Sequence, residues 1–315
     1  MTIRANLTEF GGLPVVTVAH GTPFPERTDE VAWRFTVEDQ HEAINADEAL
    51  AAWLAAVPHP ERVRALLVGA WPESWDQSAP VRAMAEAAPR FPALTHLFWG
   101  EMTWEECEIS WIQQANLDDL VAAYGNQLTE LVVRGGTNLV INPFTSPTLS
   151  NLVIETGGLD GGVVAAIARS HLPALRHLGL WLGTPEYGAL IGGLEIAELA
   201  RGTATPRLEY LGLKNSADPL RDLRALVGSP LLARLRILDL SKGVLGDECV
   251  AVLANPSFRH LAHLDLTHHY LHPASLDALR RALPATRIHA GEAEEGDETP
   301  TTTDPYAGRW VDTGE

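Results

Sequence analysis

The chain has 315 residues, 46% of them hydrophobic, so it can bury the core of one large domain or two ordinary ones, and wholesale disorder is excluded. Its net charge is −18 and it has only two lysines, Lys214 and Lys242, which argues against nucleic acid and anionic membranes as partners. The chain has only two cysteines, far apart in the sequence, so we expect no disulfide framework. It has no apolar run near 18 residues and no apolar signal core at its N-terminus, so we predict a cytoplasmic protein.

Residues 1–61 predict an α+β cap at the N-terminal end. Segments 15–18 and 33–37 have the composition of strands and flank a turn rich in Pro, Glu and Asp, which we interpret as a hairpin. A helix is expected over 47–57, with Asn45 as its N-cap. We expect this cap to cover the first unit of a repeated structure.

Residues 62–290 contain a repeat that predicts a solenoid. The pattern L-x-x-L-x-L or a close variant occurs eight times, and its fourth positions lie 21 to 34 residues apart, a spacing that fits a strand-plus-helix unit. We expect about eight or nine repeats, forming an α/β solenoid with a curved parallel sheet inside and helices outside. The eight fourth positions, all expected to be buried, are Leu66, Leu97, Leu131, Leu152, Leu178, Leu211, Leu238 and Leu264.

Apolar residues at three-to-four spacing predict helices between these strands. Asn116 and Ser275 are expected to cap two of them. The helical segments are 117–124, 163–170, 194–202, 249–255 and 276–283.

Residues 291–315 predict an acidic, mostly disordered tail. The segment has eight acidic residues and one arginine, and 291–305 is too polar to bury much apolar surface. The last ten residues carry Tyr306, Trp310 and Val311, which leaves open a docked end as the alternative to an unattached one.

The repeated leucine pattern resembles the leucine-rich-repeat superfamily, and the long helix-containing repeats are similar to its ribonuclease-inhibitor-like branch. A narrower resemblance is to a poorly characterised bacterial leucine-rich-repeat group often encoded beside radical-SAM enzymes. It is carried by segments 105–112, 134–136, 154–159, 178–183, 229–232 and 268–271. The narrower resemblance implies an accessory protein or scaffold in a biosynthetic pathway, and it implies no catalytic residue.

Equivalent outward positions of consecutive strands should form rows across the concave face of the sheet. In the C-terminal half these rows combine aromatic, charged and hydrogen-bonding side chains, a composition that suits contact with a ligand or partner. The predicted binding residues are His177, Trp181, Tyr210, Lys214, Asp239, His263 and Asp265.

The neighbouring carboxylates Asp239 and Asp265 leave three interpretations open. They are a face exposed to solvent or to Lys214 and Lys242, a contact for a partner or ligand, or, with His263, an acid–base or metal-binding group in which mutual repulsion raises one pKa or recruits a cation. The last of these defines the alternative function, a small-molecule or metal-binding protein or an enzyme that also uses Tyr210.

A secondary candidate is the acidic stretch at 104–111. Glu105, Glu106 and Glu108 surround Cys107, where they should disfavour the thiolate and hence nucleophilic catalysis. The functional interpretation is an acidic lip for a basic peptide or cation. The structural one is a loop that Ile109 and Trp111 anchor to the core.

No phosphate-binding loop, dinucleotide motif, nucleophile elbow or metal-ligand spacing accompanies these residues, so we predict no catalytic residue, cofactor or metal. The sequence therefore favours a non-catalytic protein-interaction module or scaffold whose partner is another protein or peptide.

Overall fold

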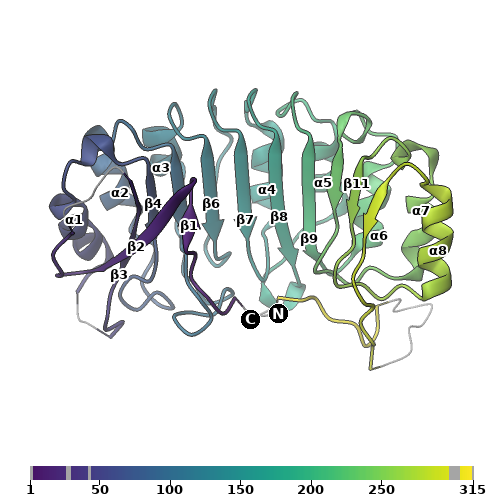
Figure 1. Ribbon diagram of the computed structural model, residues 1–315, viewed down its shortest axis with the longest axis horizontal. Helices are drawn as coiled ribbons and strands as arrows, with labels where there is room; N and C mark the ends of the chain where they lie inside the picture. Colours follow the sequence, from purple (N-terminus) through teal and green to yellow (C-terminus); the bar gives the residue numbers. More distant parts are fainter. Residues whose placement is uncertain (1–2, 26–29, 42–43, 298–305, 314–315) are drawn as a thin grey trace. The chain divides into compact units, whose positions relative to one another are not determined.

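The structure is a computed structural model that describes the chain except for residues 1–2, 26–29, 42–43, 298–305 and 314–315. The chain forms two compact units. The N-terminal unit comprises residues up to Glu155 with the return segment Ser170–Leu175, and the C-terminal unit comprises Thr156–Arg169 and Arg176–Gly314. Both units are α/β, and in each the strands pair in chain order (Figure 1).

In the N-terminal unit, β1 and β2 are antiparallel and every later pairing is parallel. Its elements are β1 (Glu9–Phe10), β2 (Leu13–Ala19), β3 (Ala32–Thr36), α1 (Ala46–Ala56), β4 (Ala65–Val68), α2 (Val81–Ala87), β5 (His96–Trp99), α3 (Asp118–Tyr124), β6 (Glu130–Arg134) and β7 (Asn151–Glu155), with 3₁₀ turns at Pro60–Arg62 and Ala88–Arg90.

In the C-terminal unit, the strand pairings β8–β9, β9–β10, β10–β11 and β11–β12 are all parallel. Its elements are α4 (Gly161–Arg169), β8 (His177–Gly183), α5 (Gly193–Ala200), β9 (Tyr210–Ser216), α6 (Pro219–Leu226), β10 (Ile237–Asp239), α7 (Val250–Leu253), β11 (His263–Asp265), α8 (Pro273–Ala282) and β12 (Arg287–His289), with 3₁₀ turns at Pro185–Tyr187, Leu232–Arg234, Asp247–Cys249 and Pro256–Phe258.

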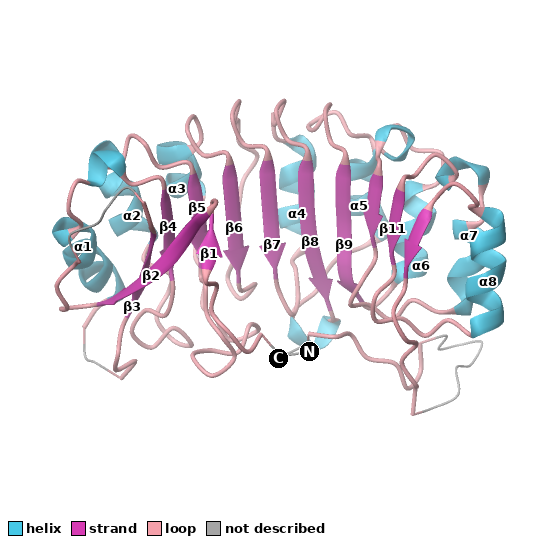
Figure 2. Ribbon diagram, in the orientation of Figure 1, coloured by secondary structure: helices cyan, strands magenta, loops and turns pink. Residues whose placement is uncertain are grey.

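Within each unit the helices lie on one face of the strands (Figure 2). We call the opposite face the strand face. The fourth positions of the leucine pattern point toward the helices, are in register within each unit, and none is more than 2% exposed. The predicted register of the repeats is confirmed at these positions. Each row of leucines stabilises its unit by burial of apolar surface between strands and helices.

The predicted helices are found within a few residues of their expected bounds. Of the predicted N-caps, the one at Asn45 is confirmed and the one at Ser275 is not. Asn45 caps α1 by accepting hydrogen bonds from the backbone N–H groups of Asp47 and Glu48. The cap prediction at Ser275 is wrong, because α8 begins earlier, after His272, whose ring accepts a hydrogen bond from the Ala274 N–H. Proline at the first helical position explains the earlier start.

The prediction of a hairpin from segments 15–18 and 33–37 is also wrong, because β2 and β3, which correspond to these segments, pair in parallel. The antiparallel hairpin is formed one strand earlier, by β1 and β2. Its residues Phe10 and Leu13 pack on the strand face of the N-terminal unit against Leu67, Phe98 and Val132. The hairpin therefore covers apolar side chains that a strand face would otherwise expose to water.

The end of the acidic tail is placed against the C-terminal unit, as in the docked alternative. Arg309 pairs with Glu248 at 2.8 Å, and the Tyr306 hydroxyl donates to Asp218 at 2.8 Å. Val311 is buried. Residues 291–297 are described as well, and the Glu294 N–H donates to the carbonyl of His269 at 2.7 Å, whereas residues 298–305 and 314–315 lie outside the described residues.

Two further contacts tie this end to the carboxyl ends of β9 and β10. The fully buried amide of Asn215 donates to the carbonyl of Thr313 and accepts a hydrogen bond from its N–H. Lys242 forms an ion pair with Asp312. The tail thus satisfies buried polar groups of the unit, which an unattached segment cannot do.

We expect deletion of 306–315 to lower the free energy of unfolding of the C-terminal unit by about 1–3 kcal/mol, because the buried Asn215 amide loses two hydrogen bonds. Amide hydrogen exchange should also accelerate at 242–248. The control is Asp312→Asn, which weakens one ion pair and should cost less than about 1 kcal/mol. Unchanged unfolding and exchange in the deletion variant would mean that the tail is not bound in solution.

Candidate functional site

The strand face of the C-terminal unit brings together five of the seven predicted binding residues. His177 on β8 and Tyr210 on β9 are register partners, and their rings stack with centroids 3.7 Å apart and planes 6° apart. Stacked rings of this kind present a rigid surface with polar groups at its edge.

Asp239 on β10 continues this arrangement. Its carboxylate accepts a hydrogen bond from the Tyr210 hydroxyl at 2.6 Å and pairs with the Lys214 ammonium at 3.3 Å. A second hydrogen bond comes from the Ser241 N–H at 2.9 Å. Asp239 is only 6% exposed, so these partners replace the water that a carboxylate requires.

Trp181, in the C-terminal half of β8, lies beside two lysine ammonium groups. Lys214 is 5.9 Å and Lys242 4.9 Å from the centroid of its ring, within the range of cation–π attraction. Lys242 also binds Asp312 of the tail. The end of the tail is therefore part of the surroundings of the predicted site. We call His177, Trp181, Tyr210, Lys214 and Asp239 the strand-face cluster.

The ionisation of the strand-face cluster is held in one state. Burial, helped by Lys214, lowers the pKa of His177 to about 4. Burial and the neighbouring Asp239 raise the pKa of Tyr210. Burial disfavours the Asp239 carboxylate, but Lys214 and the hydrogen bonds from Ser241 and Tyr210 outweigh it and lower that pKa. At neutral pH the cluster holds a neutral imidazole, a neutral phenol and a carboxylate paired with Lys214.

The lowered pKa of His177 predicts a pH dependence of stability. Between pH 6.5 and about 4 the unfolded chain binds a proton at this residue and the folded chain does not, so the contribution of His177 to stability falls as the pH falls. Allowing for screening at this half-buried site, we expect a loss of ~1–2 kcal/mol between pH 7 and 4. Urea unfolding of the protein and of His177→Gln at several pH values measures it. Parallel pH profiles would contradict the prediction.

The two remaining predicted residues, His263 and Asp265, lie on β11. Asp239 and Asp265 are register partners, as expected. The expected rise in one pKa through mutual repulsion is wrong for Asp239, whose pKa is lowered for the reasons above. Asp265 accepts hydrogen bonds from the N–H and the hydroxyl of Thr267 at 2.9 and 2.7 Å. Across the described part of the chain, no group of three His, Cys, Asp or Glu side chains is arranged to hold a metal ion.

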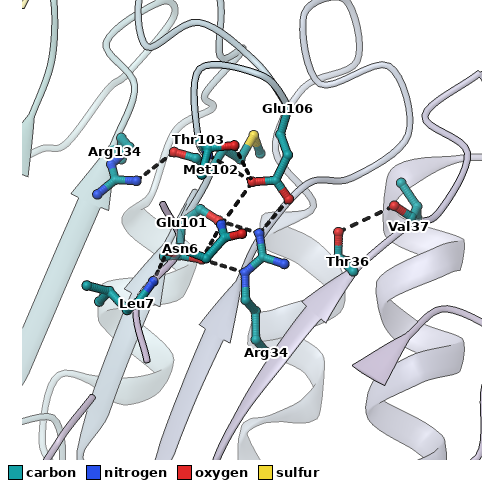
Figure 3. Close-up of polar contacts among 10 residues, drawn as sticks. All are labelled: Asn6, Leu7, Arg34, Thr36, Val37, Glu101, Met102, Thr103, Glu106 and Arg134. Carbon is teal, nitrogen blue, oxygen red and sulfur yellow. Dashed lines mark hydrogen bonds and ion pairs between the residues drawn. The ribbon is translucent and has the colours of Figure 1, made fainter. Parts of the chain in front are cut away.

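The acidic loop, residues 101–111 of the N-terminal unit, does not present its three glutamates alike. Glu105 is exposed and Glu108 half-buried, whereas Glu106 turns inward and pairs with Arg34 on β3 at 2.7 Å (Figure 3). Burial disfavours its charge, but Arg34 and hydrogen bonds from Asn6 and Thr103 lower its pKa overall. Glu106 therefore anchors the loop to β3, and its part in a recognition lip stays a prediction.

Glu101 is the second acidic partner of Arg34 and was not singled out from the sequence. The Arg34 Nε lies 2.5 Å from the Glu101 carboxylate, and both side chains are at most 3% exposed. Asn6 donates to both Glu101 and Glu106, at 3.2 and 3.0 Å, and Arg134 donates to the carbonyl of Met102 (Figure 3). This network holds the start of the acidic loop from three other segments of the chain.

The rest of the loop combines buried and exposed side chains. Ile109 is buried as predicted, but Trp111 is 58% exposed and does not anchor the loop to the core. Cys107 is buried, and burial, with a smaller contribution from Glu108, raises the pKa of its thiol to about 11. The expected suppression of the thiolate is thus found, with burial rather than the glutamates as its main cause.

No helix in the described residues has the length and apolar character needed to span a bilayer. Neither a known protein family nor a curated protein matches the sequence. Among solved structures, the chain is similar to a structural-genomics crystal structure of a Bacteroides fragilis protein, with a TM-score of 0.72 and 28% sequence identity over 82% of this chain and 76% of that one. The similarity covers most of both chains, so the α/β arrangement is shared with a bacterial protein.

Proposed function

We propose that the chain is a leucine-rich-repeat solenoid that binds a partner protein or peptide through the strand face of its C-terminal unit. Eight copies of the leucine pattern coincide with β4 to β11, one per strand, and the helices of each unit lie on one face. That arrangement is typical of strand-plus-helix repeats. The resemblance of the sequence to a bacterial repeat group often encoded beside radical-SAM enzymes supports a cytoplasmic scaffold accessory to a biosynthetic pathway, and the similarity to a Bacteroides fragilis structure supports the α/β arrangement alone.

The observation that carries the proposal is the strand-face cluster itself. Tyr210 is fixed on both sides, by stacking on His177 and by its hydrogen bond to Asp239, before any partner arrives. Rigid aromatic side chains with a polar edge lose little conformational entropy on binding, and such residues dominate the binding energy of many interfaces. In the N-terminal unit, by contrast, Phe10 and Leu13 of the hairpin occupy the strand face.

The same cluster supports binding over acid–base catalysis. A general acid or base at neutral pH needs a pKa near 7. The pKa values of His177 and Asp239 are lowered and that of Tyr210 is raised, so each moves away from neutrality.

The experiment compares the full chain with Tyr210→Ala combined with Asp239→Ala as baits in its native host, with mass spectrometry to identify the partner. We expect the double variant to lose the partner and to weaken a purified complex by at least ~30-fold in calorimetry, since an anchoring aromatic and its polar neighbour are both removed. The control is Asp277→Ala on α8, an exposed residue on the helix side. Full retention of the partner by a folded double variant would exclude this face.

A further inference from the structure

The acidic loop forms one wall of a cavity of about 300 Å³ in the N-terminal unit, lined by Trp75, Trp104, Cys107, Glu108 and Trp111. Three of the nine tryptophans of the chain thus surround one small space. Trp104 is 44% and Trp111 58% exposed, so their rings are accessible to a ligand in solution. The volume lies at the lower limit of small-molecule sites and fits a single side chain better than a nucleotide or a large cofactor.

Acidic residues predominate in the segments that line this cavity, and the ring of His41 lies 5.3 Å from that of Trp75. Segments 71–78 and 101–116, which supply all the lining residues, contain six acidic residues and no lysine or arginine. Arg34 is adjacent in the structure, but it is buried and paired with Glu101 and Glu106. Glu108 remains as the acidic member of the lining. Indole faces and a carboxylate both attract cations, the first through the ring quadrupole and the second through its charge.

The backbone around the cavity is held by contacts from several directions. The Trp104 N–H donates to the carbonyl of Ile3 at 2.9 Å, and the Gln113 N–H donates to that of Ser74 at 2.8 Å, which joins the two tryptophan-bearing segments. The Arg34 network fixes the other end of the loop. Because the segments are positioned before binding, a ligand need not order them, which reduces the entropic cost of association.

We propose that this tryptophan cavity binds the basic side chain of a partner polypeptide, a lysine ammonium or arginine guanidinium seated among Trp75, Trp104 and Trp111 and paired with Glu108. The site lies in the other unit from the strand-face cluster, and it rests on the proposed function only in taking the partner to be a polypeptide. A nucleophilic role is not part of it, because the Cys107 thiol is buried and neutral at physiological pH.

The test uses the blocked peptide Gly-Gly-Lys-Gly-Gly, its arginine counterpart and a norleucine counterpart that keeps an aliphatic chain without the charge. Indole N–H resonances of the full chain are followed by NMR during titration. We expect the lysine or arginine peptide to shift the resonances of Trp75, Trp104 and Trp111 and to bind at least ~5-fold more tightly than the norleucine peptide. Equal binding of the norleucine peptide, or no shift at these three resonances at millimolar peptide, would overturn the proposal.

Two variants locate the interaction. Trp111→Ala removes a largely exposed ring and Glu108→Gln removes the lining charge, and each should weaken binding of the basic peptide ~3- to 10-fold. The matched control is Trp310→Ala, which removes a comparably exposed tryptophan from the C-terminal unit and should leave peptide affinity unchanged. Unchanged affinity in Trp111→Ala would refute the site. Choline, added in a separate titration, reports whether a free cation also enters, and tighter binding of choline than of either basic peptide would overturn the polypeptide assignment.

The outcomes separate this proposal from the proposed function. Loss of the natural partner in the Tyr210 and Asp239 double variant tests the strand face and does not require the tryptophan cavity. Peptide binding that is sensitive to Trp111 and indifferent to Tyr210 would establish the cavity even if the strand face carried no partner.

Discussion

Replacing Leu178 with Asp should prevent the C-terminal unit from folding. Leu178 is fully buried on β8, in register with Leu211 on β9, so the carboxylate would have no water and no cationic partner. A buried unpaired charge costs several kcal/mol, about 5 or more, which is comparable to the whole stability of an ordinary domain. We expect the variant to be insoluble or to lack a cooperative thermal transition for this unit.

The chain supplies a matched control for this substitution. Leu194 on α5 is 83% exposed, so Leu194→Asp introduces the same charge at the same residue type and should change the free energy of unfolding by less than about 0.5 kcal/mol. Circular dichroism and calorimetry of both variants check the pair. A folded Leu178→Asp protein with unchanged melting would show that the assigned register of the leucine pattern is mistaken.

The repeat made the strands and their register predictable. A strand that buries alternate residues against helices must place Leu211 and Leu238 at equivalent positions, so a pattern in one dimension predicts neighbours in space. The rows that bring Tyr210 beside His177, and Asp239 beside Asp265, follow from this register alone. What the register cannot give is the side-chain partner. Asp239 has a tyrosine, a lysine and a backbone N–H as partners, and they reverse the pKa shift that its like-charged neighbour suggests.

The leucine pattern does not predict contacts between segments that lie far apart in the sequence and outside the repeats. The polar composition of the tail predicts disorder, with a docked end as the alternative, but it does not predict that Asn215 and Thr313, which are 98 residues apart, bond through buried groups. The sequence groups Glu106 with its neighbours Glu105 and Glu108 as one acidic surface, whereas in the structure Glu106 pairs with Arg34 on β3. The one available signal was Arg34 itself, a charged residue within the apolar strand segment 33–37. A charge in such a place requires a partner, though it does not say which one.

The second large effect concerns that arginine. Arg34→Met should lower the free energy of unfolding of the N-terminal unit by about 3–5 kcal/mol, because Glu101 is fully buried and would lose the guanidinium that compensates its carboxyl group. Replacing Arg176, whose pair with Glu209 is about half exposed on both sides, with Met should cost no more than about 1 kcal/mol. Urea unfolding of both variants gives the comparison.

A second substitution tests whether the unpaired charge causes the loss. Adding Glu101→Gln to Arg34→Met removes the stranded carboxylate while keeping a side chain of the same size that still accepts the hydrogen bond from the Leu7 N–H. The double variant should therefore recover a large part of the lost stability, ~1–3 kcal/mol, although it has one native side chain fewer. As the double variant regains stability, the indole NMR resonances of Trp104 and Trp111 should move back toward their positions in the unaltered protein. The reason is that residues 34 and 101 together hold the start of the loop that carries both rings. A double variant less stable than Arg34→Met would show that packing of the aliphatic part of Arg34, rather than charge compensation, holds the loop.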